Sequence, residues 1–190
     1  MQEAVLAKRI VQGYGLELRP VTFEDIELLR QWSNTPLVQK MFGHNYITPE
    51  QQFAWYQKIQ DNSREAHWVV YVQGVPTGYV GLIGEGPLEQ QEDVTAEMYV
   101  ADSPVRHALL GIAIGLVIPH IVFEIFSIPK IKALVHYSNQ MKKFNLQLGY
   151  QEEGQQDDFV EMTLIPADYY REKTKFARFF PNCEIFALEI

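Results

Sequence analysis

The sequence predicts a single α/β domain, because strand-like and helix-like segments follow one another along most of its length. With 190 residues, 47% of them hydrophobic and 13% aromatic, the chain can bury one sizeable core and is short for two. Apolar alternation and capping signals give the order β, α, α, β, β, β, α, β, α, β over residues 16–165. We expect residues 1–15 to be a lead-in and residues 166–190 to be an extension that packs on the domain.

Caps and turns mark the elements of the first half of the chain. Thr22, with Asp25 three residues later, forms a variant capping box that opens a first helix, which ends near Pro36. Thr48 followed by Pro49 opens a second helix. We expect strands at residues 16–21, 67–72 and 77–83. The last two form a hairpin around a turn that contains Gly and Pro.

A long apolar segment dominates the second half. We expect a polar loop at residues 84–93, then strands at 94–100, 130–137 and 159–165. Helices are expected between these strands, at residues 109–126 and 138–149. Pro119 and Glu124 interrupt the long segment, so we expect a buried core helix rather than a membrane span. Gly149 ends the last helix as a glycine C-cap, and residues 183–190 offer a further strand.

Charge and cysteine content exclude several classes of function. The net charge is −8 and no basic cluster stands out, which argues against nucleic-acid and membrane partners. Cys183 is the single cysteine, and the first residues lack the apolar core of a signal peptide, so we expect a cytoplasmic protein. The histidines and Cys183 show no ligand spacing, so we expect no metal site. His67, on a strand, is more typical of a structural residue than of a base.

Residues 95–126 form a strand, a turn and a helix, which is an arrangement that binds anions. The first backbone N–H groups of such a helix point into the turn, and the helix dipole adds positive potential there. Arg106 adds a full positive charge, and Gly111 lets a ligand approach the backbone. The sequence therefore predicts a cradle for a pyrophosphate.

The same turn resembles a known signature. Residues 106–111 read Arg-His-Ala-Leu-Leu-Gly and are similar to the Arg/Gln-x-x-Gly-x-Gly/Ala pattern of the Gcn5-related N-acetyltransferases, with Leu109 at the usual glycine position. The order of elements over residues 16–165 is also the order of that family. The resemblance implies acetyl-CoA as cosubstrate, with its pyrophosphate held by Arg106, His107, Ala108, Leu109, Leu110 and Gly111.

The resemblance also implies a fold and further cofactor contacts. It implies a single mixed, mostly antiparallel sheet of six to seven strands flanked by helices, the acyl-CoA N-acyltransferase fold. Its fourth and fifth strands splay apart, and backbone groups of Met98, Tyr99 and Val100 then bind the pantetheine arm. Asn139 matches an asparagine that bonds the cofactor near its ribose or pantetheine. From the residues alone, Asn139 is equally an N-cap of the following helix.

N-acetylation needs a base for the amine and an acid for the leaving thiolate. Glu97 is the expected base. It faces either a cleft, where burial would raise its pKa towards neutrality, or solvent. Asn145 occupies the position of the family's usual tyrosine acid. We expect Tyr137 to replace it, and Tyr150, a bound water or unassisted departure of the thiolate remain alternatives.

The first two helices bear on the acceptor, which we expect to be a small-molecule amine. Residues 29–56 look like the N-terminal part of the aminosugar N-acetyltransferases of the pseudaminic acid pathway, with Ser33 where those proteins have arginine. Relatives that acetylate ribosomal proteins or aminoglycosides share the architecture. The acidic net charge favours a cationic acceptor. A nucleotide sugar would need a local basic patch drawn from Arg30, Lys40, Arg171, Lys173, Lys175 and Arg178.

Two hypotheses of other kinds stand beside the enzyme. One is a CoA-binding or protein-binding domain that has lost turnover, and the other is the same fold without CoA. The aromatic residues of the first helices either stack on a sugar or fill the core, and they are Trp32, Phe42, Tyr46, Trp55 and Tyr56. The sequence leaves open which amine is acetylated and whether the chain forms a homodimer.

Overall fold

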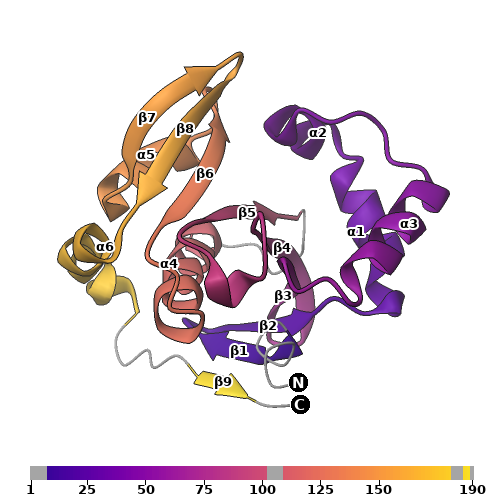
Figure 1. Ribbon diagram of the computed structural model, residues 1–190, viewed down its shortest axis with the longest axis horizontal. Helices are drawn as coiled ribbons and strands as arrows, with labels where there is room; N and C mark the ends of the chain where they lie inside the picture. Colours follow the sequence, from indigo (N-terminus) through magenta and orange to yellow (C-terminus); the bar gives the residue numbers. More distant parts are fainter. Residues whose placement is uncertain (1–7, 102–108, 181–185, 189–190) are drawn as a thin grey trace.

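One sheet runs through the described part of the molecule. The computed structural model describes residues 8–101, 109–180 and 186–188 (Figure 1). Within them, nine strands form a sheet in the order β7-β8-β6-β5-β4-β3-β2-β1-β9. The strands are β1 (Ile10–Gly13), β2 (Leu16–Pro20), β3 (Glu65–Val72), β4 (Val75–Ile83), β5 (Val94–Val100), β6 (Ile131–His136), β7 (Gln151–Gln156), β8 (Phe159–Leu164) and β9 (Phe186–Leu188). All neighbours are antiparallel except β5 and β6, which confirms the predicted mixed, mostly antiparallel sheet.

The sheet has more strands than the six to seven expected. β1 pairs with both β2 and β9, and its four residues are too few to show an alternation in the sequence. β7 reads Gln-Glu-Glu-Gly-Gln-Gln and is exposed along its whole length, so it carries no apolar pattern. Backbone pairing with β8, rather than burial of side chains, defines β7 as a strand. β9 lies within the last strand that the sequence offered.

Six α-helices cover the sheet in two groups. They are α1 (Ile26–Ser33), α2 (Pro36–Phe42), α3 (Pro49–Ile59), α4 (Leu110–His120), α5 (Met141–Leu148) and α6 (Pro166–Glu172), all within the described residues. The first three gather on one side of the view and the last three lie apart from them (Figure 1). The structure confirms a predicted cap at the N-terminus of α3 and another at the C-terminus of α5. Thr48 and Gln51 form a capping box at α3, and Gly149 adopts a left-handed φ of 104° after α5.

Two apolar clusters lie on opposite faces of the sheet. The larger one contains α4, α5 and α6, and the smaller one joins α1 and α3 to β3, β4 and β5. The residues of β5 alternate between them: Ala96, Met98 and Val100 pack on the larger cluster. Tyr99 packs on the smaller one. Because side chains alternate along a strand, Glu97 shares the face of Tyr99.

The long apolar segment is the central helix of the larger cluster. α4 is buried over most of its length and continues as a π-helical turn, Ile121–Ile125, just after Pro119. Gly115 permits the close packing of α4 on α5, because a Cβ there would lie 2.4 Å from the ring of Phe144. The prediction of a core helix is therefore confirmed. None of the helices that the structure describes combines the length and hydropathy needed to cross a bilayer.

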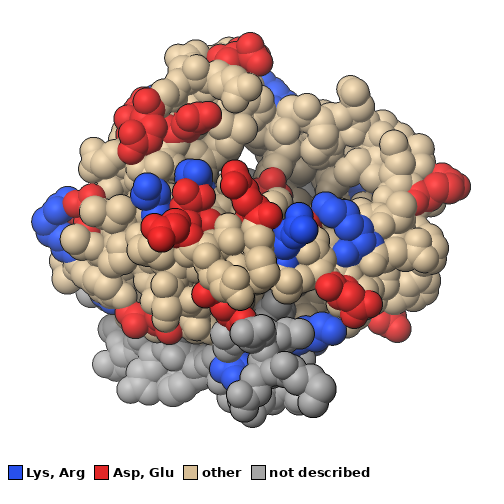
Figure 2. Space-filling model, in the orientation of Figure 1, with Lys and Arg blue, Asp and Glu red and all other residues tan. Residues whose placement is uncertain are grey.

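The parallel strands β5 and β6 separate soon after they begin. Their register contains only two pairs, Val94 with Ile131 and Thr95 with Lys132. Within the described residues, β5 then continues to Val100 with β4 as its only partner, whereas β6 continues with β8. Figure 1 shows β6 leaving β5 towards β7 and β8, and Figure 2 shows a hollow in the molecule between that part and α2. This separation confirms the predicted splay.

Candidate active site

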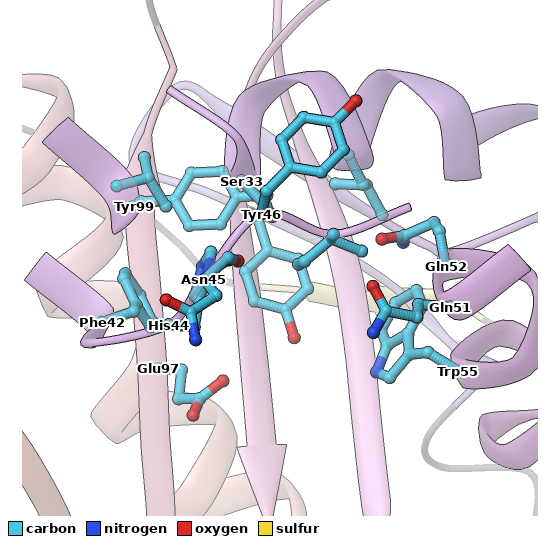
Figure 3. Close-up of a pocket in the computed structure, with 14 residues that line it drawn as sticks. Ser33, Phe42, His44, Asn45, Tyr46, Gln51, Gln52, Trp55, Glu97 and Tyr99 are labelled. Carbon is cyan, nitrogen blue, oxygen red and sulfur yellow. Dashed lines mark hydrogen bonds between the residues drawn. The ribbon is translucent and has the colours of Figure 1, made fainter. Parts of the chain in front are cut away.

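A pocket of about 460 Å³ lies on the face of the sheet that α1, α2 and α3 cover. In Figure 3, Glu97 stands on one side of this pocket and Gln51 and Trp55 of α3 stand on the other. The lining residues come from the first three helices, the loop after α2, and β4 and β5. They are Leu29, Ser33, Val38, Phe42, His44, Asn45, Tyr46, Ile47, Gln51, Gln52, Trp55, Tyr79, Glu97 and Tyr99.

Glu97 is the only carboxylate among the described residues that line the pocket. It is partly buried, and its cross-strand partner on β4 is Gly81, which contributes no side chain to cover it. Burial raises the pKa of Glu97 above its usual value, and the negative charge of Glu65 raises it further. Of the two orientations that the sequence left open, the structure has the one that faces a cavity.

Stacked aromatic rings form the floor of the pocket. Tyr79 and Tyr99 stack with centroids 5.1 Å apart, and Phe42 meets the edge of Tyr99 at 5.8 Å. Of the aromatic residues that the sequence singled out, Phe42, Tyr46 and Trp55 line the pocket. Trp32 and Tyr56 pack on the smaller apolar cluster without lining the pocket, and Trp55 does both. Core packing is therefore confirmed for Trp32, Tyr56 and Trp55, and stacking on a sugar stays a prediction.

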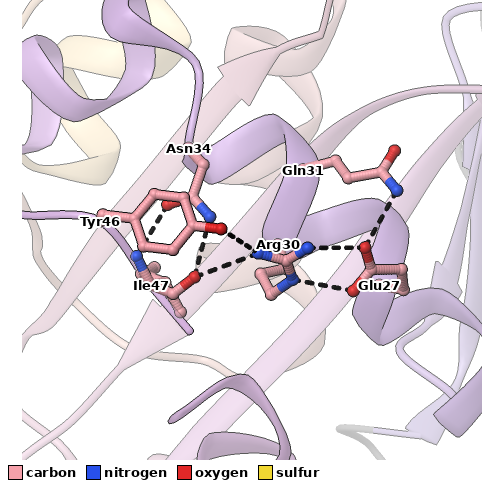
Figure 4. Close-up of polar contacts among 6 residues, drawn as sticks. All are labelled: Glu27, Arg30, Gln31, Asn34, Tyr46 and Ile47. Atoms are coloured by element: carbon pink, nitrogen blue, oxygen red, sulfur yellow. Dashed lines mark hydrogen bonds and ion pairs between the residues drawn. The ribbon is translucent and has the colours of Figure 1, made fainter. Parts of the chain in front are cut away.

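The loop that closes the pocket is tied to α1 by two side chains (Figure 4). Asn34 brackets Ile47, donating from Nδ2 to its carbonyl at 2.8 Å and accepting its N–H at Oδ1 at 2.7 Å. Arg30 donates to the hydroxyl of Tyr46 at 3.0 Å and forms a bidentate pair with Glu27. Neither role can be read from a local sequence pattern, because the bonds to the loop join residues 13 to 17 positions apart. Arg30 is committed to these partners, which lowers its availability for an anionic ligand.

The predicted pyrophosphate cradle lies partly outside the described residues. Arg106, His107 and Ala108 fall there, so their expected roles stay predictions. Leu109 precedes α4, Leu110 is buried in the first turn, and Gly111 is open. Of the described residues outside the helix itself, only Met141 would come within 4 Å of a Cβ on Gly111, at 3.5 Å or more. The described part of the cradle is thus a helix N-terminus with room for a ligand beside its second residue.

The other expected cofactor residues lie along the splay. Met98, Tyr99 and Val100 belong to the stretch of β5 that has left β6, so no described strand pairs with one edge of their backbone. Asn139 lies after β6, and its side-chain oxygen accepts the N–H of Met141 at 2.9 Å. The N-cap of α5 is Gln140, so Asn139 lies one residue before the expected cap position and bonds the first residue of the helix. Its contact with a cofactor stays a prediction.

The proposed acid, Tyr137, does not line the pocket. Its side chain is 58% exposed and stacks on His136, with centroids 4.8 Å apart. Asn145 donates weakly to the sulfur of Met162, and Tyr150 is buried in the larger cluster. The structure therefore does not bring Tyr137 together with Glu97 in one cavity. In the described part of the chain there is also no group of three or more metal-ligating side chains.

Two glycines in β4 were a signal that the sequence analysis left unused. Gly78 and Gly81 flank Tyr79, and glycine inside a strand often marks a close approach of another group. A Cβ on Gly78 would lie 2.6 Å from the carbonyl of Tyr99, and one on Gly81 would lie 2.5 Å from the hydroxyl of Tyr79. Gly81 thus makes room on the pocket side of the sheet, whereas Gly78 lies on the opposite face, where its Cβ would also approach Ile114 of α4 at 3.6 Å.

Comparisons with known proteins agree with this fold. The chain resembles a spermidine N-acetyltransferase from Vibrio cholerae, solved with CoA and spermine, at 20% identity and a TM-score of 0.70, over 82% of this chain and 98% of that one. It resembles AAC(6')-Ib, solved with paromomycin and acetyl-CoA, at 18% identity and a TM-score of 0.68, over 83% and 97%. It resembles apo FdhC, a nucleotide-linked sugar GNAT, at 18% identity and a TM-score of 0.71, over 89% of this chain and 97% of that one.

The search of curated proteins found no match. The family model described as an acetyltransferase (GNAT) domain matches residues 15–143, which is well over half of the chain. Those residues contain the pocket, the splayed strand β5 and the whole of α4. The chain therefore belongs to the GNAT acetyltransferase family.

Proposed function

We propose that the protein transfers an acetyl group from acetyl-CoA to a primary amine of a small aminosugar. The observation that carries this proposal is the position of Glu97. Glu97 lines the pocket and belongs to β5, where it is the second residue after the last one that pairs with β6. A pantetheine arm along that free edge would bring a thioester to the mouth of the same pocket. Amine, base and acyl group then meet at one point.

The cofactor would be held by backbone groups and one helix end. The edge of β5 at Met98, Tyr99 and Val100 offers N–H and C=O groups that no strand occupies. The N-terminus of α4 at Leu110 and Gly111 presents N–H groups that no described side chain caps. Arg106 would add charge for the pyrophosphate. When bound, acetyl-CoA supplies the activated acyl group, and the residues named here position it.

Glu97 would act as the general base. An amine attacks a thioester only as a neutral nucleophile, so its ammonium form must first lose a proton. A carboxylate whose pKa is raised by burial is a better proton acceptor than an exposed one. The thiolate, with an ordinary thiol pKa of about 8.5, is a tolerable leaving group even without a tyrosine beside it. Tyr137 is exposed and outside the lining, so it would protonate the thiolate only after moving towards the pocket, and otherwise Glu97 would return the amine proton to the thiolate.

The chemistry of the pocket supports an aminosugar as acceptor. Its walls combine aromatic faces with the amides of Asn45, Gln51 and Gln52, which suit the faces and hydroxyls of a sugar ring. Among the described residues, the lining contains one carboxylate and no Lys or Arg. A cationic amine fits this charge better than a diphosphate does. The nucleotide of a sugar nucleotide would therefore have to lie outside this pocket.

The C-terminal basic residues offer little support for a nucleotide. Arg171 pairs with Asp168 and Glu172, and Lys175 also pairs with Glu172. Figure 2 likewise shows Lys and Arg interspersed with Asp and Glu on the face in view. Replacing Arg171 and Lys175 by glutamate should therefore leave the acetylation of a cationic aminosugar unchanged. A loss confined to sugar nucleotides would instead favour the sugar-nucleotide acceptor.

An amine panel tests the proposal. The purified protein with acetyl-CoA is offered aminoglycosides, amino-sugar nucleotides, polyamines and peptides with free N termini, and free thiol and acetylated product are measured. We expect the highest kcat/KM with a cationic aminosugar. Faster acetylation of polyamines or peptides would overturn the substrate class. CoA binding without turnover of any amine would favour the CoA-binding domain that has lost activity.

A further inference from the structure

Four polar side chains link the pocket to the surface in one hydrogen-bonded series. The hydroxyl of Tyr79, which lines the pocket, lies 2.7 Å from Nδ1 of His67. Nε2 of His67 lies 3.1 Å from Glu65, and Glu65 accepts a bond from Lys58 at 2.9 Å. The His67 side chain is 3% exposed and that of Glu65 is 9% exposed, whereas that of Lys58 is 66% exposed. Only the two ends of the series therefore reach the pocket and solvent.

The register of the sheet places this series in line with Glu97. Glu97 on β5 pairs with Gly81 on β4, and Gly81 pairs with His67 on β3, so the three residues form one row across the sheet. The hydroxyl of Tyr79 lies over the glycine, in the middle of the row. It therefore stands between the carboxylate in the pocket and the imidazole.

Resting on the proposed function, we propose that Tyr79, His67 and Glu65 form a second proton acceptor of the active site, which works beside Glu97. An acceptor ammonium must lose two protons to become an amide. One ends on the CoA thiol and the other ends in solvent, but a single carboxylate holds only one at a time. A second group that takes up a proton inside the pocket removes this conflict.

The proton transfer balances on the residues present. The first ammonium proton passes to the Tyr79 oxygen, directly or through a hydroxyl of the acceptor, while the proton of Tyr79 moves to Nδ1 of His67. Tyr79 stays neutral and His67 becomes an imidazolium, whose charge Glu65 offsets at Nε2. Glu97 then takes the second proton and returns it to the thiolate. After the products leave, His67 gives its proton back through Tyr79 to the open pocket.

The groups around His67 favour this role. The titratable groups that contact His67 are Glu65 on its own strand and Tyr79 on β4. Glu97 and Tyr99 lie beyond Tyr79, and Lys58 of α3 lies beyond Glu65. Burial, and then the charge of Glu97, raises the pKa of Tyr79 well above its usual value. Its hydroxyl therefore stays protonated and passes a proton on rather than ionising.

Tyr79→Phe is the sharpest test, because it keeps the ring stacked on Tyr99 and removes only the hydroxyl. Its matched control is Tyr71→Phe, a partly buried tyrosine on β3 outside the pocket. We expect Tyr79→Phe to lower kcat at neutral pH by about 10²-fold, within the usual range for a lost proton-transfer group. KM for acetyl-CoA should match that of wild type, and the control should keep its kcat. The melting temperature of Tyr79→Phe should fall modestly at every pH, because the buried Nδ1 of His67 loses its partner.

The pH dependence separates a proton acceptor from a structural residue. At high pH, or with an acceptor amine of low pKa, the amine enters neutral and only one proton must move. The loss in Tyr79→Phe should then shrink towards zero, and His67→Gln and Glu65→Gln should show the same trend. A loss that is constant over pH and acceptors, or no loss at all, would overturn the proposal. Absence of turnover in wild type would overturn the proposed function as well, whereas an active wild type with an unimpaired Tyr79→Phe overturns only the second acceptor.

Discussion

The hydroxyl of Tyr79 occupies the space that a side chain on Gly81 would need. A Cβ on Gly81 would lie 2.5 Å from Tyr79 Oη and 3.2 Å from Nδ1 of His67. A glycine at this one position thus lets the tyrosine lie across the sheet, bond His67 and face the row that contains Glu97. The site therefore requires a glycine at position 81, because any side chain there would displace the Tyr79 hydroxyl.

Gly81→Ala should therefore damage both the fold and the activity. The methyl group has to displace the Tyr79 ring, which is packed on Tyr99, and such overpacking typically costs about 1–3 kcal/mol. We expect a lower melting temperature and a kcat reduced at least as much as in Tyr79→Phe. Gly154→Ala is the control, because its Cβ would approach only Glu161, at 3.8 Å. Equal stability and activity of Gly81→Ala and wild type would contradict this account.

Glu97→Gln should lower turnover far more than it weakens CoA binding. The change keeps the shape of the side chain and removes its ability to accept a proton, which typically contributes about 10²–10⁴-fold to rate. Because burial raises the pKa of Glu97, wild-type activity should fall as pH drops through that raised pKa. The variant should lose this acidic limb in a profile of kcat/KM against pH. An unchanged profile would assign the base to another group.

The same variant should be at least as stable as wild type at neutral pH. A carboxyl group whose folded pKa is raised favours folding while it is protonated, below its unfolded pKa. That contribution is lost as pH rises through the folded pKa. Glutamine avoids the loss, so the advantage of Glu97→Gln should appear at pH 7 and vanish near pH 4. Thermal unfolding at the two pH values measures this, and lower stability at pH 7 would argue against the burial of the charge.

Glu65→Gln should show the opposite dependence. The bond to His67, supported by Lys58, lowers the pKa of Glu65 to about 2. The stabilisation is therefore present above the unfolded pKa of 4.5 and is lost as pH falls towards 2. We expect the variant to lose about 1–3 kcal/mol at pH 7, as for a hydrogen bond to a charged group, with a gap that narrows in acid. Denaturant unfolding gives the free energies, and a gap that stays constant with pH would be inconsistent with this pairing.

Asn34→Ala should weaken acceptor binding through the loop it holds. Its two bonds to Ile47 fix the segment that carries His44, Asn45 and Tyr46 into the pocket. We expect KM for the amine to rise by about tenfold, equivalent to about 1.4 kcal/mol, with little change in KM for acetyl-CoA. Gln155→Ala is the control, since Gln155 also bonds a backbone carbonyl but lies on the exposed strand β7. A similar rise in both KM values would mean that the loop acts on the whole fold.

CoA should stabilise the folded protein. A ligand held by strand edges and a helix end binds only the native state, so CoA at a hundredfold excess over Kd should add about 2.7 kcal/mol. Arg106→Ala should weaken CoA by about 1–3 kcal/mol without changing the melting temperature of the free protein. Arg64→Ala, an exposed arginine on the turn before β3, is the control. No thermal shift at millimolar CoA would rule out the cofactor site.

The sequence by itself determined the features that depend on near neighbours in the chain. The capping box at Thr48, the glycine cap at Gly149 and the alternation that places Glu97 and Tyr99 on one face of β5 all arise within a few residues. Backbone geometry fixes such features locally, so a pattern of residue types is enough to predict them. The splay of β5 from β6 was predicted from the family resemblance, because nothing in the composition of the two strands indicates it.

The tertiary structure alone decided what the pocket contains. His67 looked like a structural residue, and only the register of β3, β4 and β5 aligns it with Gly81 and Glu97. Tyr137, favoured by its place in the sequence, is exposed and lies outside the lining. Register and loop closure depend on pairings between distant segments, whose free energies no local pattern records. The chemistry of this site therefore follows from which strands meet, and in which register.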